Sequence, residues 1–142
     1  MAMTNTDRVL KYCAYQDRSC WEVRRKMREL KMSSAEADEL LALLEAEHYV
    51  DDARFAESFI RGKMGLKRWG RVKLAVELRK RGVEQSLVNE KLAELDETVY
   101  ENNLQYLKER WERENPDGDR AKLYRFLMGK GYTGEEISGV VG

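Results

Sequence analysis

Basic side chains are the residues of this chain whose types and spacing could do chemistry. Between Arg61 and Arg81 the sequence holds nine lysines and arginines and a single acid, Glu77, although the whole chain carries no net charge. Such groups bind phosphates or acidic protein surfaces, and Trp69 among them could stack on a base or pack over a helix junction. A solvated surface with ion pairs between helices would give the same pattern, so both interpretations stay open.

Other reactive side chains are sparse. His48 is the only histidine, and the sequence has no CxxC pair and no GxxxxGKS/T loop. These features argue against a zinc site, a catalytic triad and a nucleotide-binding loop of that type. We therefore expect no enzyme, no cofactor and no metal. Asp51 and Asp52 could suggest a metal, but their place before the apolar residues Phe55 and Ala56 favours a helix cap.

Composition predicts an all-α, cytoplasmic protein. Charged residues make up 37% of the chain, which has one proline and many Ala, Leu, Glu, Lys and Arg residues. No apolar run approaches the roughly 18 residues of a membrane span, and the N-terminal stretch lacks the features of a signal peptide. Cys13 and Cys20 then indicate a reducing compartment and buried packing.

The sequence repeats itself three times with a period of about 50 residues. Segments 22–32, 72–83 and 121–132 align, and apolar positions coincide in all three. The matched sets are Val23, Leu74 and Leu123; Met27, Leu78 and Leu127; Met32, Val83 and Tyr132; and Ala37, Val88 and Ile137. Because each copy alone would bury too little surface, we expect three tandem three-helix repeats of helix-turn-helix type in an elongated, curved array.

Each repeat is predicted to hold three helices. The first repeat (1–50) has 7–16, 20–30 and 34–47, the second (51–96) has 52–65, 71–81 and 85–95, and the third (97–142) has 97–114, 120–130 and 134–141. The expected N-caps of the three middle helices are Ser19, Gly70 and Asp119. Capping boxes are predicted for Ser19 with Glu22, Ser33 with Glu36, and Thr133 with Glu136.

Helix ends follow the same register. Asp51 is the expected N-cap of the fourth helix, with Val50 and Phe55 as its hydrophobic staple. Gly82 and Gly131 fall where a left-handed residue would end the middle helix, and Lys31 occupies that position in the first repeat.

Charge is sorted by helix. Every middle helix is basic and every third helix is acidic, as in 18–31 against 36–57. Zero net charge argues against a strong binder of free DNA, whose domain would be markedly basic. A target that offers both signs of charge, such as a nucleoprotein, fits this pattern better.

Two motifs resemble a known family. Tyr49-Val50-Asp51-Asp52-Ala53-Arg54-Phe55-Ala56 resembles the signature "G-[YF]-[IL]-D-D-x-x-F-A" of RecX proteins, regulators of the RecA recombinase, with His48 where a glycine often stands. Trp69-Gly70, Glu77-Leu78 and Lys80-Arg81-Gly82-Val83 are similar to that family's "G-x-x-x-I-x-x-E-L-x-x-K-G-I" segment, with Arg81 inserted before the glycine. The resemblance covers nearly the whole chain, because the family is also built of three tandem three-helix repeats.

The resemblance implies a non-enzymatic, cytoplasmic and monomeric protein that binds the RecA filament on single-stranded DNA. Lying in the filament groove, it would suppress ATP hydrolysis, filament growth and strand exchange. End-capping, groove occupation and severing stay open as mechanisms. The residues expected to make the contacts are Lys67, Arg68, Arg71, Lys73 and Lys80, then Arg24, Arg25 and Arg28, with Trp69 as a further candidate. The alternative is a direct DNA-binding protein of helix-turn-helix type, and a structural helical-repeat adaptor is a third possibility.

Overall fold

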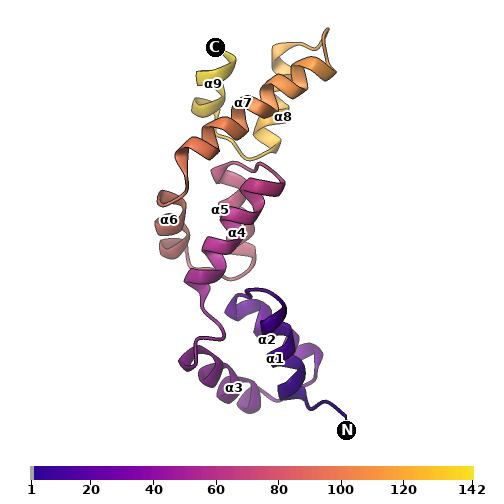
Figure 1. Ribbon diagram of the computed structural model, residues 1–142, viewed down its shortest axis with the longest axis vertical. Helices are drawn as coiled ribbons and strands as arrows, with labels where there is room; N and C mark the ends of the chain where they lie inside the picture. The colour runs from indigo at the N-terminus through magenta and orange to yellow at the C-terminus, as the bar shows by residue number, and fades with distance from the viewer. Residues whose placement is uncertain (1) are drawn as a thin grey trace.

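The computed structural model describes residues 2–142, and this part of the chain forms nine α-helices and no strand (Figure 1). The helices are α1 (Asn5–Tyr15), α2 (Cys20–Glu29), α3 (Ser34–Ala46), α4 (Asp52–Leu66), α5 (Arg71–Lys80), α6 (Gln85–Ala93), α7 (Glu97–Glu114), α8 (Arg120–Gly129) and α9 (Gly134–Val141). Their ends differ from the predicted ones by two residues or fewer. The all-α prediction is confirmed.

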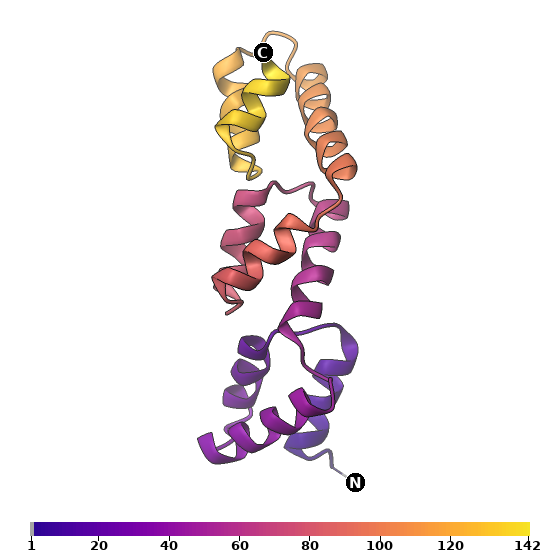
Figure 2. The same cartoon turned by 90° about the vertical axis from the view of Figure 1, so that its left-hand side faces the viewer.

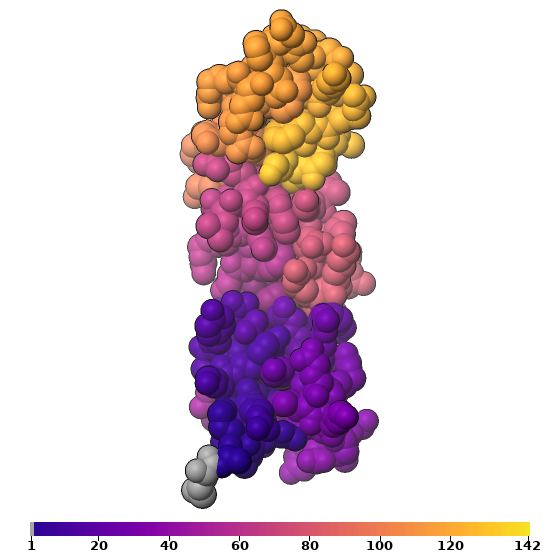
Figure 3. All heavy atoms as spheres, turned by 90° about the vertical axis from the view of Figure 1, so that its right-hand side faces the viewer, coloured from indigo at the N-terminus to yellow at the C-terminus, as the bar shows by residue number. Residues whose placement is uncertain are grey.

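The helices pack in three successive groups, α1–α3, α4–α6 and α7–α9, along one long axis (Figure 1). The N-terminus lies at one end of the molecule and the C-terminus at the other. The view turned by 90° keeps the same end-to-end order (Figure 2), and the atoms form an elongated body (Figure 3). The predicted elongated array of tandem repeats is therefore confirmed.

Polar side chains start these helices as the sequence indicates. Ser19, Ser33 and Thr133 each form a complete capping box, and Gly70 and Asp119 are the N-caps of α5 and α8. The sequence reading missed a fourth box, in which the Thr4 side chain accepts from the backbone of Asp7. The Thr4 N–H in turn donates to the Asp7 carboxylate, so α1 begins two residues earlier than predicted.

A left-handed residue ends each middle helix. The φ angles are 80° at Gly82, 101° at Gly131 and 59° at Lys31. In each case the next N–H reaches back to the helix, as from Val83 to the Leu78 carbonyl (3.2 Å). The first repeat thus makes the same turn with a lysine, although a side chain is disfavoured in this conformation.

The buried residues form two hydrophobic cores. One runs continuously through α4–α9, from Phe55 to Ile137, and the other is confined to α1–α3 and the chain that follows them. Val50 belongs to the N-terminal core and Phe55 to the larger one, so the staple predicted between them is not formed. The second and third repeats share one core, whereas the first has its own.

Gly131 and Gly129 give a matched test of this architecture. A Cβ added at Gly131 would lie 2.7 Å from the Lys73 backbone nitrogen, at a φ that side chains avoid, whereas a Cβ at Gly129 would meet nothing within 4 Å. We expect Gly131→Ala to lower the free energy of unfolding by about 2–4 kcal/mol. Gly129→Ala should raise it by up to about 1 kcal/mol. Urea unfolding followed by circular dichroism measures both, and equal effects would contradict the close approach at Gly131.

Candidate phosphate-binding surface

The middle helices α2, α5 and α8 follow one another along the long axis, head to tail (Figure 1). At the junction of the second and third repeats, the Gly70 N–H donates to the Lys130 carbonyl (2.8 Å) and the Val72 N–H donates to the Gly131 carbonyl (2.9 Å). Carbonyl groups at the end of α8 thereby accept hydrogen bonds from N–H groups at the start of α5 that have no partner within their own helix. At the other junction, Gly82 at the end of α5 lies against Trp21 at the start of α2. The three basic helices therefore form one column.

Arg71 holds the junction of the second and third repeats. Its Nη2 donates to both carboxylate oxygens of Glu97 (2.6 and 2.7 Å), and its Nε donates to Glu136 (3.2 Å). The Tyr100 hydroxyl accepts from the Arg71 backbone (3.0 Å) and donates to Glu136 (3.0 Å). Burial raises the pKa of Tyr100, so the hydroxyl keeps its proton. The network joins α5, α7 and α9.

Polar contacts also join the first and second repeats. Asp51 caps α4 as predicted, while the neighbouring Asp52 accepts from the backbone of Cys20 at the start of α2 (2.8 Å). Asp17 accepts from Arg54 (3.0 Å) and from the Ser58 hydroxyl (2.6 Å). The predicted cap is therefore confirmed for Asp51, and Asp52 links two repeats.

The two cysteines are free and half-buried. Burial raises the pKa of Cys13, and burial followed by the charge of Asp52 raises the pKa of Cys20 to about 12. Both thiols are therefore protonated at neutral pH, and packing is the role that the structure gives them.

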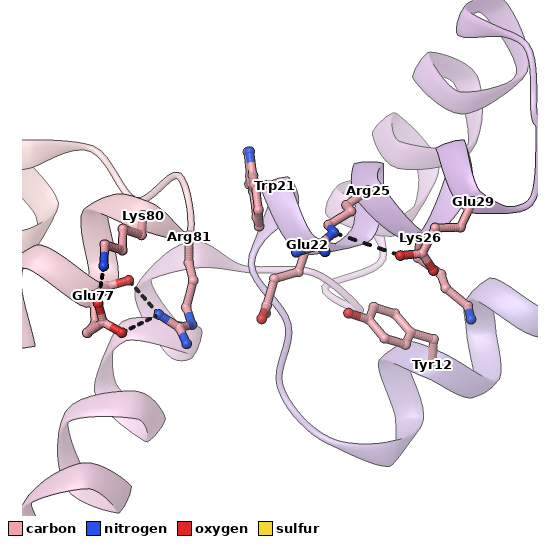
Figure 4. Close-up of a pocket in the computed structure, with 9 residues that line it drawn as sticks. All are labelled: Tyr12, Trp21, Glu22, Arg25, Lys26, Glu29, Glu77, Lys80 and Arg81. Atoms are coloured by element: carbon pink, nitrogen blue, oxygen red, sulfur yellow. Dashed lines mark hydrogen bonds and ion pairs between the residues drawn. The ribbon is translucent and has the colours of Figure 1, made fainter.

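Four of the predicted contact residues are paired within the protein. Arg24 contacts Asp38 (2.8 Å), Arg25 contacts Glu29 (3.8 Å), and Lys80 contacts Glu77 (3.1 Å), while Arg71 is held in the network described above. Arg25 and Lys80 also line a cleft of about 420 Å³ at the first junction, where Figure 4 shows Trp21, in the first turn of α2, between Arg81 on one side and Arg25 on the other. Both signs of charge line this cleft, so it carries little net positive charge.

The remaining predicted residues separate into two places. Arg28 is exposed on α2, whereas Lys67, Arg68 and Lys73 lie at the junction of the second and third repeats. Trp69 is half-buried beside Phe59, with ring centroids 6.2 Å apart, so it packs over the α4–α5 junction. Its stacking on a base stays a prediction.

The structure adds two residues that the sequence reading missed. Arg110 on α7 and Lys130 at the end of α8 lie near Lys67, Arg68 and Lys73, and we call these five residues the junction cluster. The Arg68 guanidinium lies 3.9 Å from the centre of the Tyr106 ring, and that of Arg110 lies 6.0 Å from the same ring. Nothing in the local sequence of Arg110 or Lys130 indicates this meeting, because it depends on how the repeats dock.

Comparison with known proteins identifies the family. Residues 7–44 match the model of the first three-helix domain of RecX, and residues 51–92 match that of the second. The regulatory protein RecX of Ralstonia pickettii is 30% identical over 135 residues, which covers 94% of this chain and 84% of that protein. The chain belongs to the RecX family. The RecX of Prosthecochloris aestuarii is 28% identical over a match that covers 92% of this chain and 87% of that protein.

Solved RecX structures share the fold. The crystal structure of RecX from Lactobacillus salivarius superposes with a TM-score of 0.86 at 21% identity, covering 96% of this chain and 92% of that one. A second RecX crystal structure gives a TM-score of 0.84, also at 21% identity, with 96% and 69% coverage. The relatives carry the name of regulatory proteins, and this chain belongs to that class of protein.

The RecX motifs now have a structural meaning. Asp51 caps α4, Asp52 accepts from the Cys20 N–H of α2, Glu77 pairs with Lys80 and Arg81, and Gly82 makes the left-handed turn against Trp21. His48, where the signature often has glycine, has a φ of 61°, a left-handed backbone conformation that is uncommon for residues other than glycine. Of these residues, Asp52 and Gly82 make contacts between the first and second repeats, and the others act within one repeat or its connecting loop.

Two further features concern residues 2–142 only. No helix in this range is both long and apolar enough to cross a bilayer. Within the same range, no three histidine, cysteine or acidic side chains gather in a way that could hold a metal ion.

Arg71 should prove to be a structural residue. Arg71→Gln would leave Glu136, whose side chain is 22% exposed, without its cation, and we expect the free energy of unfolding to fall by about 1–3 kcal/mol. Lys67→Gln removes an exposed charge and should change stability by less than about 0.5 kcal/mol. Chemical unfolding of both variants tests this. Wild-type stability in Arg71→Gln would show that the network carries no net energy.

Asp17 should make stability depend on pH. Hydrogen bonds from Ser58, then from Arg54, hold the pKa of Asp17 below its ordinary 3.8. The carboxylate therefore contributes stability that is fully present above that pH and is lost as the pH falls through the folded value. We expect Asp17→Asn to melt at a lower temperature than wild type at pH 7, and the gap to narrow towards pH 3. A gap of constant size across this range would contradict the assignment.

Proposed function

We propose that this protein modulates the RecA recombinase by binding the RecA filament on single-stranded DNA, mainly as a negative regulator. Membership of the RecX family supports a regulatory role, and the resemblance to RecA regulators suggests this partner. The observation that carries the proposal beyond the family name is the column of basic middle helices. Bound in the filament groove, the protein would suppress ATP hydrolysis, filament growth and strand exchange.

The charge distribution favours a filament over free DNA. The net charge is zero, yet basic residues lie along α2, α5 and α8, while acidic residues lie along α3 and beside α6. A filament presents phosphates and protein together, so both signs of charge find partners on it. The elongated body also suits a groove that spans several recombinase subunits, because each repeat can meet the next subunit in turn (Figure 3).

Direct DNA binding of helix-turn-helix type fits the charges less well. In such proteins the second helix of the motif enters the major groove and places donors on base edges and phosphates. Here the corresponding helices are α3, with Glu36, Asp38 and Glu39 near its start, and α6, with Glu90 and Glu94 at or after its end. These carboxylates would face phosphates and repel them.

The deciding measurement compares three targets. We expect tight binding to a RecA–ATP filament on single-stranded DNA, weaker binding to the same strand alone, and the weakest binding to duplex DNA. The protein should also slow the filament's ATPase. If four to six basic residues meet phosphates, the logarithm of affinity should fall against the logarithm of salt concentration with a slope of about −3 to −5.

Two outcomes would count against the proposal. Tight, sequence-selective binding to bare duplex with an unchanged ATPase would favour the helix-turn-helix alternative. Binding to none of the three targets would leave a helical adaptor as the remaining interpretation. A control is Lys11→Gln, which removes an exposed charge of α1, a helix outside the column, and should behave as wild type.

A further inference from the structure

Five cations meet at the junction of the second and third repeats. Lys67 and Arg68 follow α4, Lys73 lies on α5, Arg110 on α7 and Lys130 at the end of α8. Backbone contacts fix their approach, since the Gly70 N–H donates to the Lys130 carbonyl (2.8 Å) and the Tyr132 hydroxyl donates to the Arg68 carbonyl (2.7 Å). Lys73 Nζ lies 3.5 Å from the Gly129 carbonyl. The cluster exists only when the two repeats are docked.

Little within the described chain offsets this charge. The one ion pair recorded for the five residues joins Arg110 Nε to Glu114 at 3.9 Å, with side chains 35% and 65% exposed. The C-terminal end of α8 contributes about half a negative charge. Together these amount to less than two negative charges against five positive ones. The remainder is a local excess of positive charge in a protein that is neutral as a whole.

The cluster also holds donors without acceptors. The Nε atoms of Arg68 and Arg110 are buried, and each lacks a hydrogen-bond partner among residues 2–142. Burial, followed by the charges of Arg110, Lys73, Lys67 and Arg68, lowers the pKa of Lys130. Holding cations together in this way costs free energy, which a purely structural role would avoid by placing a carboxylate among them. Arg71, whose charge is matched by Glu97 and Glu136 at the same junction, illustrates that alternative.

Aromatic rings lie beside the cations. Lys73 Nζ is 4.9 Å from the centre of the Trp69 ring, and Lys63 Nζ is 5.1 Å from it. Tyr106, whose ring lies near the guanidinium groups of Arg68 and Arg110, is 40% exposed. Basic groups interleaved with aromatic faces are typical of proteins that bind single strands, whose unpaired bases can stack beside the phosphates. An acidic protein segment would use the charges but not the rings.

We propose that the junction cluster is a composite binding site for phosphodiester groups of single-stranded nucleic acid, formed jointly by the second and third repeats. The guanidinium groups of the two arginines can each donate two hydrogen bonds to one phosphate, and the three lysines add positive charge around it. The inference rests on the proposed function and deepens it, because it assigns the nucleic-acid contact to this junction. The paired residues Arg24, Arg25 and Lys80 then have a lesser part in phosphate binding.

The test compares two double variants that remove the same charge from the intact chain. Lys67→Gln with Lys130→Gln removes two members of the cluster, whereas Arg8→Gln with Lys11→Gln removes two exposed charges from α1, which is not one of the three middle helices. Fluorescence anisotropy with a labelled single-stranded oligonucleotide, without recombinase, gives the affinity between 50 and 300 mM salt.

Each single-strand phosphate contact contributes about 0.7 to the salt slope, so the cluster variant should lose about 1.4 from its slope and roughly 10- to 30-fold in affinity near 100 mM salt. The control variant should keep the wild-type slope. Thermal melting should place the cluster variant at or above the wild-type temperature, because repulsion is relieved. Equal slopes for both variants, with folding intact, would overturn the inference.

A second arm separates this site from the proposed function. Binding of the cluster variant to an acidic peptide, tested with poly-glutamate, should stay as weak as that of wild type. A loss of poly-glutamate binding with unchanged oligonucleotide binding would overturn the site in favour of a protein ligand. If wild type binds the oligonucleotide through the cluster but leaves the RecA filament's ATPase unchanged, the proposed function fails while the site stands.

Discussion

The structure depends on a backbone contact between two helix ends. Where α8 ends and α5 begins, the two backbone segments approach so closely that a Cβ on Gly70 would lie 2.6 Å from the Tyr132 nitrogen. That proximity lets two N–H groups of the α5 start find carbonyls at the α8 end, so polar groups that helix ends leave unpaired satisfy one another. Because this geometry admits no side chain, it fixes how the two repeats are oriented. The shared core of α4–α9 and the alignment of α5 with α8 follow from it.

The junction of the first and second repeats is held by different interactions. Between the first and second repeats the links are side-chain to backbone and side-chain to side-chain contacts, from Asp52 to Cys20 and from Arg54 and Ser58 to Asp17, and no hydrophobic core crosses it. Hydrogen bonds to charged groups are worth more than neutral ones, yet solvent screens partly exposed pairs. The first repeat is therefore joined to the second by these polar contacts and by the packing of Trp21 against Gly82, whereas the second and third repeats share one core.

Local signals explain how much of this could be predicted from the sequence. Helix starts depend on residues within one turn, such as Ser33 and Glu36, and helix ends on one left-handed position, so the helices could be placed closely. The basic surface was predicted as a stretch of charge, but whether each charge is free depends on tertiary contacts. Arg71 stands in the most basic segment and is neutralised by Glu97 and Glu136, which are 26 and 65 residues away along the chain. Arg110 and Lys130 were missed for the converse reason, since docking alone brings them to Lys67.

The residues that resemble the family are therefore not the ones that carry free charge. Asp51, Asp52, Glu77 and Gly82 are occupied in caps, an internal ion pair and a turn, all within or between repeats. A signature made of such residues specifies the spacing and orientation of repeats, and hence the shape of a long binding surface. It says little about which side chains touch a ligand, because ligand contact requires groups that the fold leaves unsatisfied. In this chain the junction cluster holds such groups, and its members come from the region of three helices and from the loop that follows a fourth. The shape identifies the family, and the unsatisfied charge is the basis on which we propose where nucleic acid binds.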